Sequence, residues 1–235
     1  SDLTLTTSGT LSVEDVDLLD SVTASVVSVV AGGTTSGLGA DPATLRSMLN
    51  VDVGQVIDAS HTTGTLHWSF DSATTQSVFN AAAYGAAMNL WMIGGMVGDA
   101  PSAANYTTLQ PYNEAFDYLS AGEQLTLTYT VRASDGTAST DRNVVVTITG
   151  TNDAPVVAAI AQHDLTEQAD TNALTTSVTV NFTDVDLTDT GHTVSVTAAH
   201  ASGVTDGLAL DEAGLIALLT PGLVTKNAGS SSGTV

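Results

Sequence analysis

The residues best suited to chemistry in this chain are closely spaced aspartates. Asp184 and Asp186 lie two residues apart in the segment TDVDLTD, and Asp189 follows three residues later. In an extended backbone, the side chains of residues i and i+2 point to the same side. Two carboxylates held this close repel each other unless a cation lies between them or one of them binds a proton. Hard oxygen ligands of this kind favour Ca²⁺, which takes about six to eight oxygens.

The same acidic pattern occurs near the N-terminus, where Asp15 and Asp17 lie in the segment EDVDLLD. Asp15 and Asp184 are 169 residues apart, and so are Leu66 and Val235, which end the matching segments TTGTL and SSGTV. An internal match at a fixed offset indicates a repeat. The recurrence favours cation binding over the simpler alternative, a solvated acidic turn that keeps the protein soluble.

Composition narrows the class of protein. The 235 residues include 25 acidic and 4 basic ones, for a formal net charge of −21, which argues against binding to nucleic acid or to an anionic membrane surface. Cysteine is absent, so disulfides and thiolate chemistry are excluded. The apolar stretch 79–98 has the length of a membrane span, but its Asn and Gly residues and the lack of basic flanks predict no membrane insertion.

Alternating hydrophobic residues predict an all-β fold. In QLTLTYTVRAS (124–134), apolar residues alternate with threonines, and NVVVTITG (143–150) follows after a turn at Asp135-Gly136. GTLHWSF (64–70) is a third predicted strand. SVTASVVSVV (21–30) and HTVSVTAAH (192–200) are expected to be equivalent strands of the two copies.

Helix signals are few. Asp41-Pro42 predicts the start of a short helix that turns Leu45, Met48 and Leu49 toward the core. Residues 76–97 are rich in Ala, Met and Gly, and we expect the insertion that contains them to be partly helical.

The segment GTNDAP (150–155) reads as a linker, which Pro155 makes fairly stiff. We therefore expect a first unit over residues 1–150, with an insertion at 71–114, and an incomplete second unit over 151–235. If the copies fold alike, the second unit lacks strands that its own core needs.

Four segments carry a family resemblance: LTEQ (165–168), FTDVDLTDTGHTVSVT (182–197), FDYLSAGEQLTLTYTVRASDG (116–136) and VTITGTNDAPVV (146–157). Together they resemble the VCBS repeat, which forms long tandem arrays in giant secreted bacterial proteins, many of them RTX-type adhesins exported by type I secretion. The resemblance implies tandem immunoglobulin- or cadherin-like β-sandwiches with Ca²⁺ near the domain junctions. It also implies a location outside the cell or on the bacterial surface.

The resemblance implies two sets of metal ligands. At the junction, the ligands would come from the linker, from the LTEQ segment and from the second acidic segment. The first copy would use its own aspartates, with the turn after the long strand as a further source. The implied ligands are Asn152, Asp153, Glu167, Asp184, Asp186 and Asp189, and Asp15, Asp17 and Asp135 in the first copy.

Three hypotheses for the function follow. The first is a Ca²⁺-rigidified structural repeat of an adhesin or surface filament, whose partners are neighbouring repeats. The second is a self-assembling filament or surface-layer subunit, completed by strands from another chain. The third is a module that binds a cell-surface glycan or protein through the insertion. The favoured and simpler interpretation of the insertion is a helix or flap that covers one end of the sandwich.

We expect no enzyme, because the chain carries no G-x-S-x-G, H-E-x-x-H or P-loop motif. His192 lies beside the second acidic segment and is expected to be a structural hydrogen-bond partner.

Overall fold

The computed structural model describes residues 4–73, 75–79, 88, 107–111, 115–167, 169 and 173–235. These residues form antiparallel sheets with two short helices, which confirms the all-β class. The chain divides into two compact units. The first unit comprises Ser1–Phe116 and Gln124–Thr149, and the second comprises Asp117–Glu123 and Gly150–Val235.

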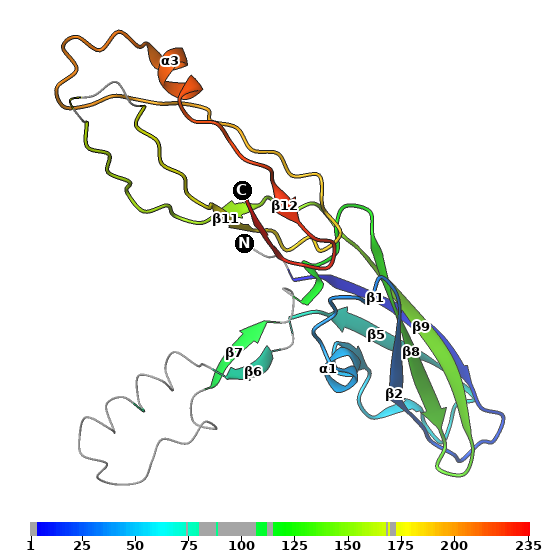
Figure 1. Ribbon diagram of the computed structural model, residues 1–235. Helices are drawn as coiled ribbons and strands as arrows, with labels where there is room; N and C mark the ends of the chain where they lie inside the picture. Colours follow the sequence, from blue (N-terminus) through cyan, green and yellow to red (C-terminus); the bar gives the residue numbers. More distant parts are fainter. Residues whose placement is uncertain are drawn as a thin grey trace. The chain divides into compact units, whose positions relative to one another are not determined.

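The first unit contains two main sheets (Figure 1). One has the strand order β1-β5-β3, and the other has the order β4-β2-β8-β9. All of their strand pairs are antiparallel. The strands are β1 (Thr6–Glu14), β2 (Val22–Gly33), β3 (Leu49–Val51), β4 (Gln55–Ile57), β5 (Thr63–Asp71), β8 (Gln124–Ser134) and β9 (Ser139–Thr149).

The core of the first unit lies between these two sheets. The predicted alternation holds along β8, where Leu125, Leu127, Tyr129 and Val131 are buried and the threonines between them are half-buried. Tyr129 meets Phe70 of the other sheet edge to face, with ring centroids 6.4 Å apart. Aromatic pairs prefer this geometry, so the contact fixes the two sheets against each other.

Helix α1 (Pro42–Ser47) begins where the sequence predicts. The Asp41 carboxylate accepts a 2.8 Å hydrogen bond from the N–H of Thr44, which satisfies one of the free donors at the helix start. The three apolar residues predicted to face the core are buried: Leu45, Met48 and Leu49. The Tyr129 hydroxyl donates a 2.8 Å hydrogen bond to the Leu45 carbonyl oxygen.

The insertion at 71–114 is described only in part. Strand β6 (Thr75–Phe79) pairs antiparallel with β7 (Thr107–Pro111), so residues 76–79 are extended, whereas Met88 is helical, as expected for a partly helical insertion. Apart from Met88, the rest of the expected helical region lies outside the described residues. Among the described residues, no helix is long and apolar enough to cross a membrane.

The second unit has one small sheet with the order β10-β11-β13-β12 and one helix (Figure 1). The Asp211 carboxylate caps the helix by accepting a 2.8 Å hydrogen bond from the N–H of Gly214, as Asp41 caps α1. The elements are β10 (Val156–Val157), β11 (Asn181–Thr183), α3 (Glu212–Ala217), β12 (Thr225–Lys226) and β13 (Ser232–Thr234).

The strand predicted over residues 192–200 is not formed. Its counterpart in the first unit, β2, pairs along most of its length with β8, from Thr23 opposite Ser134 to Gly33 opposite Leu125. The sequence holds no second copy of the β8 segment. Among the described residues, no strand pairs with residues 192–200 as β8 pairs with β2.

Candidate metal sites

The two acidic segments form the same loop in both copies. The N–H of Asp15 donates to the carbonyl oxygen of Thr62 at 2.9 Å, and the N–H of Asp184 donates to that of Ser231, also at 2.9 Å. Both donors and both acceptors are 169 residues apart. We call residues 15–20 the first acidic loop and residues 184–189 the second acidic loop.

The internal geometry of the loops also recurs. The N–H of Asp17 donates to Oδ1 of Asp15 at 3.0 Å, and the N–H of Asp186 donates to Oδ1 of Asp184 at 3.0 Å. Each loop thus begins with an aspartate that holds the backbone of the residue two positions later, a turn that aspartate favours. The D-x-D spacing therefore has a local structural role in addition to the charge that it carries.

In the first copy, three carboxylates converge. One oxygen each of Asp15, Asp20 and Asp135 lies within 4.8 Å of the other two. Asp135 and Asp15 belong to the predicted set, whereas the exposed Asp17 is not in this group and Asp20 takes its place. The three-residue spacing to Asp20, which aligns with Asp189 in the repeat, is the sequence signal that could have identified it.

Asp135 is held by its own turn. Its Oδ1 accepts hydrogen bonds from the N–H groups of Thr137 and Ala138, each at 2.6 Å. These bonds, the one from Ala138 first, lower the pKa of the Asp135 carboxyl below its ordinary value. The carboxylate is therefore kept charged beside two other acids, an arrangement that a cation would stabilise.

In the second copy, the acidic pair is buried. Asp184 is 3% exposed and Asp186 is 0% exposed. Oδ2 of Asp186 accepts a 2.7 Å hydrogen bond from the N–H of Asp153, but Oδ1 has no partner among the described residues. Burial raises the pKa of Asp186 above its ordinary value, and the nearby negative charges of Asp184, Asp189 and Asp153 raise it further. The hydrogen bond from the N–H of Asp153 acts in the opposite direction and lowers this pKa.

His192 holds the other carboxylate of the pair. Its Nε2 lies 2.5 Å from Oδ2 of Asp184, and its ring lies 5.0 Å from that of Phe182. Within the described part of the chain, Nδ1 of His192 is buried without a hydrogen-bond partner. This contact matches the structural hydrogen-bonding role expected for His192.

The structure separates the predicted junction ligands. The charges of Asp153, Asp184 and Asp189 act on Asp186, whereas Glu167 is exposed and is not among the charges that shift Asp186. The Asn152 side chain is also exposed, and its Nδ2 donates to the carbonyl oxygen of Asp153 at 2.6 Å.

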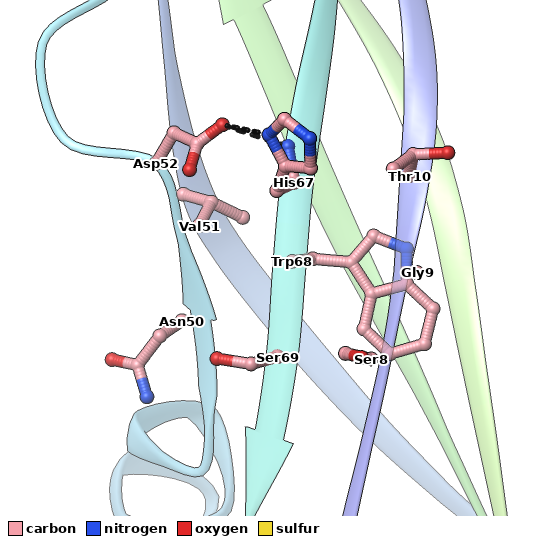
Figure 2. A pocket seen from close by; sticks show the side chains of 9 residues that line it. All are labelled: Ser8, Gly9, Thr10, Asn50, Val51, Asp52, His67, Trp68 and Ser69. Atoms are coloured by element: carbon pink, nitrogen blue, oxygen red, sulfur yellow. Dashed lines mark hydrogen bonds and ion pairs between the residues drawn. The ribbon is translucent and has the colours of Figure 1, made fainter.

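Apart from the acidic loops, the β1-β5-β3 sheet carries a hollow with a volume of about 380 Å³. Figure 2 shows Asp52 and His67 pointing toward each other at its rim, with Oδ2 of Asp52 2.9 Å from Nδ1 of His67. The Trp68 ring lies across Gly9, where a Cβ would stand only 2.6 Å from a ring carbon. Gly9 is therefore required by the close approach of this ring.

Compared with known proteins, the chain matches no family model, no curated protein and no solved structure. The resemblance to the VCBS repeat stays a prediction that depends on the four sequence segments.

Proposed function

We propose that this chain is a Ca²⁺-rigidified structural repeat of a large secreted bacterial adhesin or surface filament. The observation that carries the proposal is Asp186, a carboxylate with no exposed surface and with one oxygen unpartnered among the described residues. Burying a charge is unfavourable unless it is paired or binds a metal. The charges of Asp184, Asp189 and Asp153 also act on Asp186, and a cation bound at its free oxygen would favour the ionised carboxylate.

The donor set fits Ca²⁺ among the common metals. The side chains of Asp153, Asp184, Asp186 and Asp189 supply only oxygen atoms. Ca²⁺ prefers such ligands and tolerates irregular geometry, whereas transition metals prefer nitrogen or sulfur. Burial, together with the charges of Asp184, Asp189 and Asp153, raises the pKa of Asp186, and bound Ca²⁺ would oppose this rise by favouring the ionised carboxylate.

The same site connects to the linker. Asp153 lies in the GTNDAP segment, and its backbone N–H donates to Asp186. A cation at Asp186 would keep this carboxylate charged and so strengthen its bond to the linker. A fixed linker followed by the rigid Pro155 gives a stiff connection between repeats. Ca²⁺ that binds only the native state also stabilises that state by mass action.

Calorimetry tests the proposal. We expect the chain to bind Ca²⁺ in an isothermal titration and excess EDTA to lower its melting temperature by many degrees. Asp186→Asn removes the buried charge and should reproduce much of the EDTA effect. Asp206→Asn, at an exposed aspartate outside both loops, is the matched control. Identical melting curves with Ca²⁺ and with EDTA would disprove the proposal.

A second candidate function is self-assembly through strand donation between chains. Of the nineteen buried apolar side chains in the described residues, sixteen belong to the first unit and three, Tyr118, Leu119 and Phe182, to the second. Val156, Val157 and Val194 of the second unit are exposed. Unpaired strand segments accept strands from other chains.

Light scattering separates the two candidates. A filament or surface-layer subunit should form larger species as the protein concentration rises, in Ca²⁺ or in EDTA. A monomer in both conditions would rule out self-assembly. The third hypothesis, a glycan- or protein-binding surface on the insertion, falls mainly on residues outside the described part of the chain.

A further inference from the structure

The side chain of Lys226, on strand β12, reaches the backbone of the second acidic loop. It is only 9% exposed, and its Nζ donates to the carbonyl oxygens of Asp186 at 2.5 Å and Asp189 at 2.7 Å. Residues 151–235 contain ten acidic residues, and Lys226 is their only lysine or arginine. The single lysine or arginine of residues 151–235 therefore contacts the loop in which three of their aspartates lie within six residues.

The equivalent position in the first copy is apolar. Lys226 and Ile57 are 169 residues apart, and the packing around them recurs: a Cβ on Gly64 would collide with the carbonyl oxygen of Val56, and one on Gly233 with that of Thr225. Ile57 is 1% exposed. The buried position is thus common to both copies, and only the second fills it with an ammonium group.

The contacts of the ammonium group show what it does. Carbonyl oxygens at the turns of a loop are groups that Ca²⁺ often binds. Here the ammonium group binds two of them, and hydrogen bonds from a charged donor are stronger than neutral ones. Because the contacts are to carbonyls, Oδ1 of Asp186 remains without a partner among the described residues. The ammonium group and a metal ion at Asp186 would therefore use different oxygens.

We propose that Lys226 is a built-in cation of the second acidic loop. By holding the Asp186 and Asp189 carbonyl oxygens together, it keeps the loop in shape without a metal ion. The loop would then already have its shape when the Ca²⁺ of the proposed function binds. The role of Lys226 does not require that Ca²⁺ binds.

Hydrogen exchange of the full chain, measured by NMR in EDTA, tests the role of Lys226. The reporters are the amides of Asp189, bonded to the Asp186 carbonyl oxygen, and Gly229, bonded to the Leu187 carbonyl oxygen. In Lys226→Met, which keeps an unbranched apolar stem, these amides should exchange about tenfold to a hundredfold faster, the range expected for losing a charged hydrogen bond. Lys226→Arg keeps the charge and should stay close to wild type.

Two further controls keep the test specific. Ile57→Met changes the equivalent position without changing charge and should leave both reporters unaffected. The amides of Val180 and Val235, which bond each other's carbonyls, report on the small sheet and should not change in Lys226→Met. Unchanged reporters in Lys226→Met, equal loss in Lys226→Arg, or acceleration throughout the sheet would each overturn the proposal.

The outcome is separable from that of the proposed function. If the wild-type chain binds no Ca²⁺, the proposed function fails while the EDTA experiment on Lys226→Met still decides the role of the lysine. If Ca²⁺ binds and the reporters do not respond to the substitution, the calcium site stands and Lys226 has no part in shaping it.

Discussion

The two units build the same acidic loop with very different support. In the first unit the loop connects strands of two sheets that enclose sixteen buried apolar side chains. In the second unit the loop keeps its hydrogen bonds although only three apolar side chains are buried there. The loop geometry is therefore set by local sequence, whereas strand formation needs partners that lie far away in the chain.

Buried polar groups take a larger share in the second unit. Asp184, Asp186, His192 and Lys226 occupy its interior, and they hold one another or the loop backbone. Polar interiors of this kind are sensitive to any loss of a partner, because the group left behind pays its desolvation cost in full. We expect the first unit to respond mainly to packing mutations and the second mainly to charge.

The largest effect should come from removing a core aromatic. Phe70→Ala leaves a cavity beside Tyr129 and should lower the free energy of unfolding of the first unit by about 3–5 kcal/mol. Urea denaturation followed by the fluorescence of Trp68, on the same strand, measures it. Phe182→Ala, in the second unit, should leave this transition unchanged. A shift as large as that of Phe70→Ala would show that the two units unfold as one.

The next effect concerns which aspartates bind a cation in the first copy. Because Asp20 converges with Asp15 and Asp135 and Asp17 does not, Asp20→Asn should weaken Ca²⁺ binding there by about tenfold, since affinity follows the number of charged ligands. Asp17→Asn, an exposed aspartate of the same loop that lies outside the converging group, is the matched control. Isothermal titration of both variants decides between them, and a larger loss in Asp17→Asn would restore the set predicted from the sequence.

The sequence predicts what depends on neighbours along the chain. The alternation in β8 and β9, the helix that begins after Asp41, and the recurrence of the acidic loops all follow from short segments. The strand expected at 192–200 does not form, because alternation alone does not make a strand without a paired neighbour such as β8 is for β2. Which carboxylates converge, such as Asp20 with Asp15 and Asp135, depends on where loops meet, which spacing alone does not give.

Buried hydroxyl groups offer a smaller test of the first core. Tyr129→Phe removes the hydrogen bond to the Leu45 carbonyl oxygen, which ties β8 to helix α1, and keeps the ring contact with Phe70. The free energy of unfolding of the first unit should fall by about 1 kcal/mol. The same urea titration measures it. A loss as large as that of Phe70→Ala would mean that the hydrogen bond, rather than the packing, holds the sheets.

The smallest effect should come from the helix caps, which both units share. The N–H of Thr44 lowers the pKa of the Asp41 carboxyl, so its stabilising contribution is fully present above the ordinary pKa of 3.8 and is lost as the pH falls through the lowered value. Asp41→Ala should therefore slightly destabilise the first unit at neutral pH and flatten the acid side of its stability curve. Asp211→Ala, at the corresponding cap, should leave the first unit unchanged. Equal acid slopes in wild type and Asp41→Ala would show that the cap adds nothing to α1, and that packing of Leu45 alone maintains the helix.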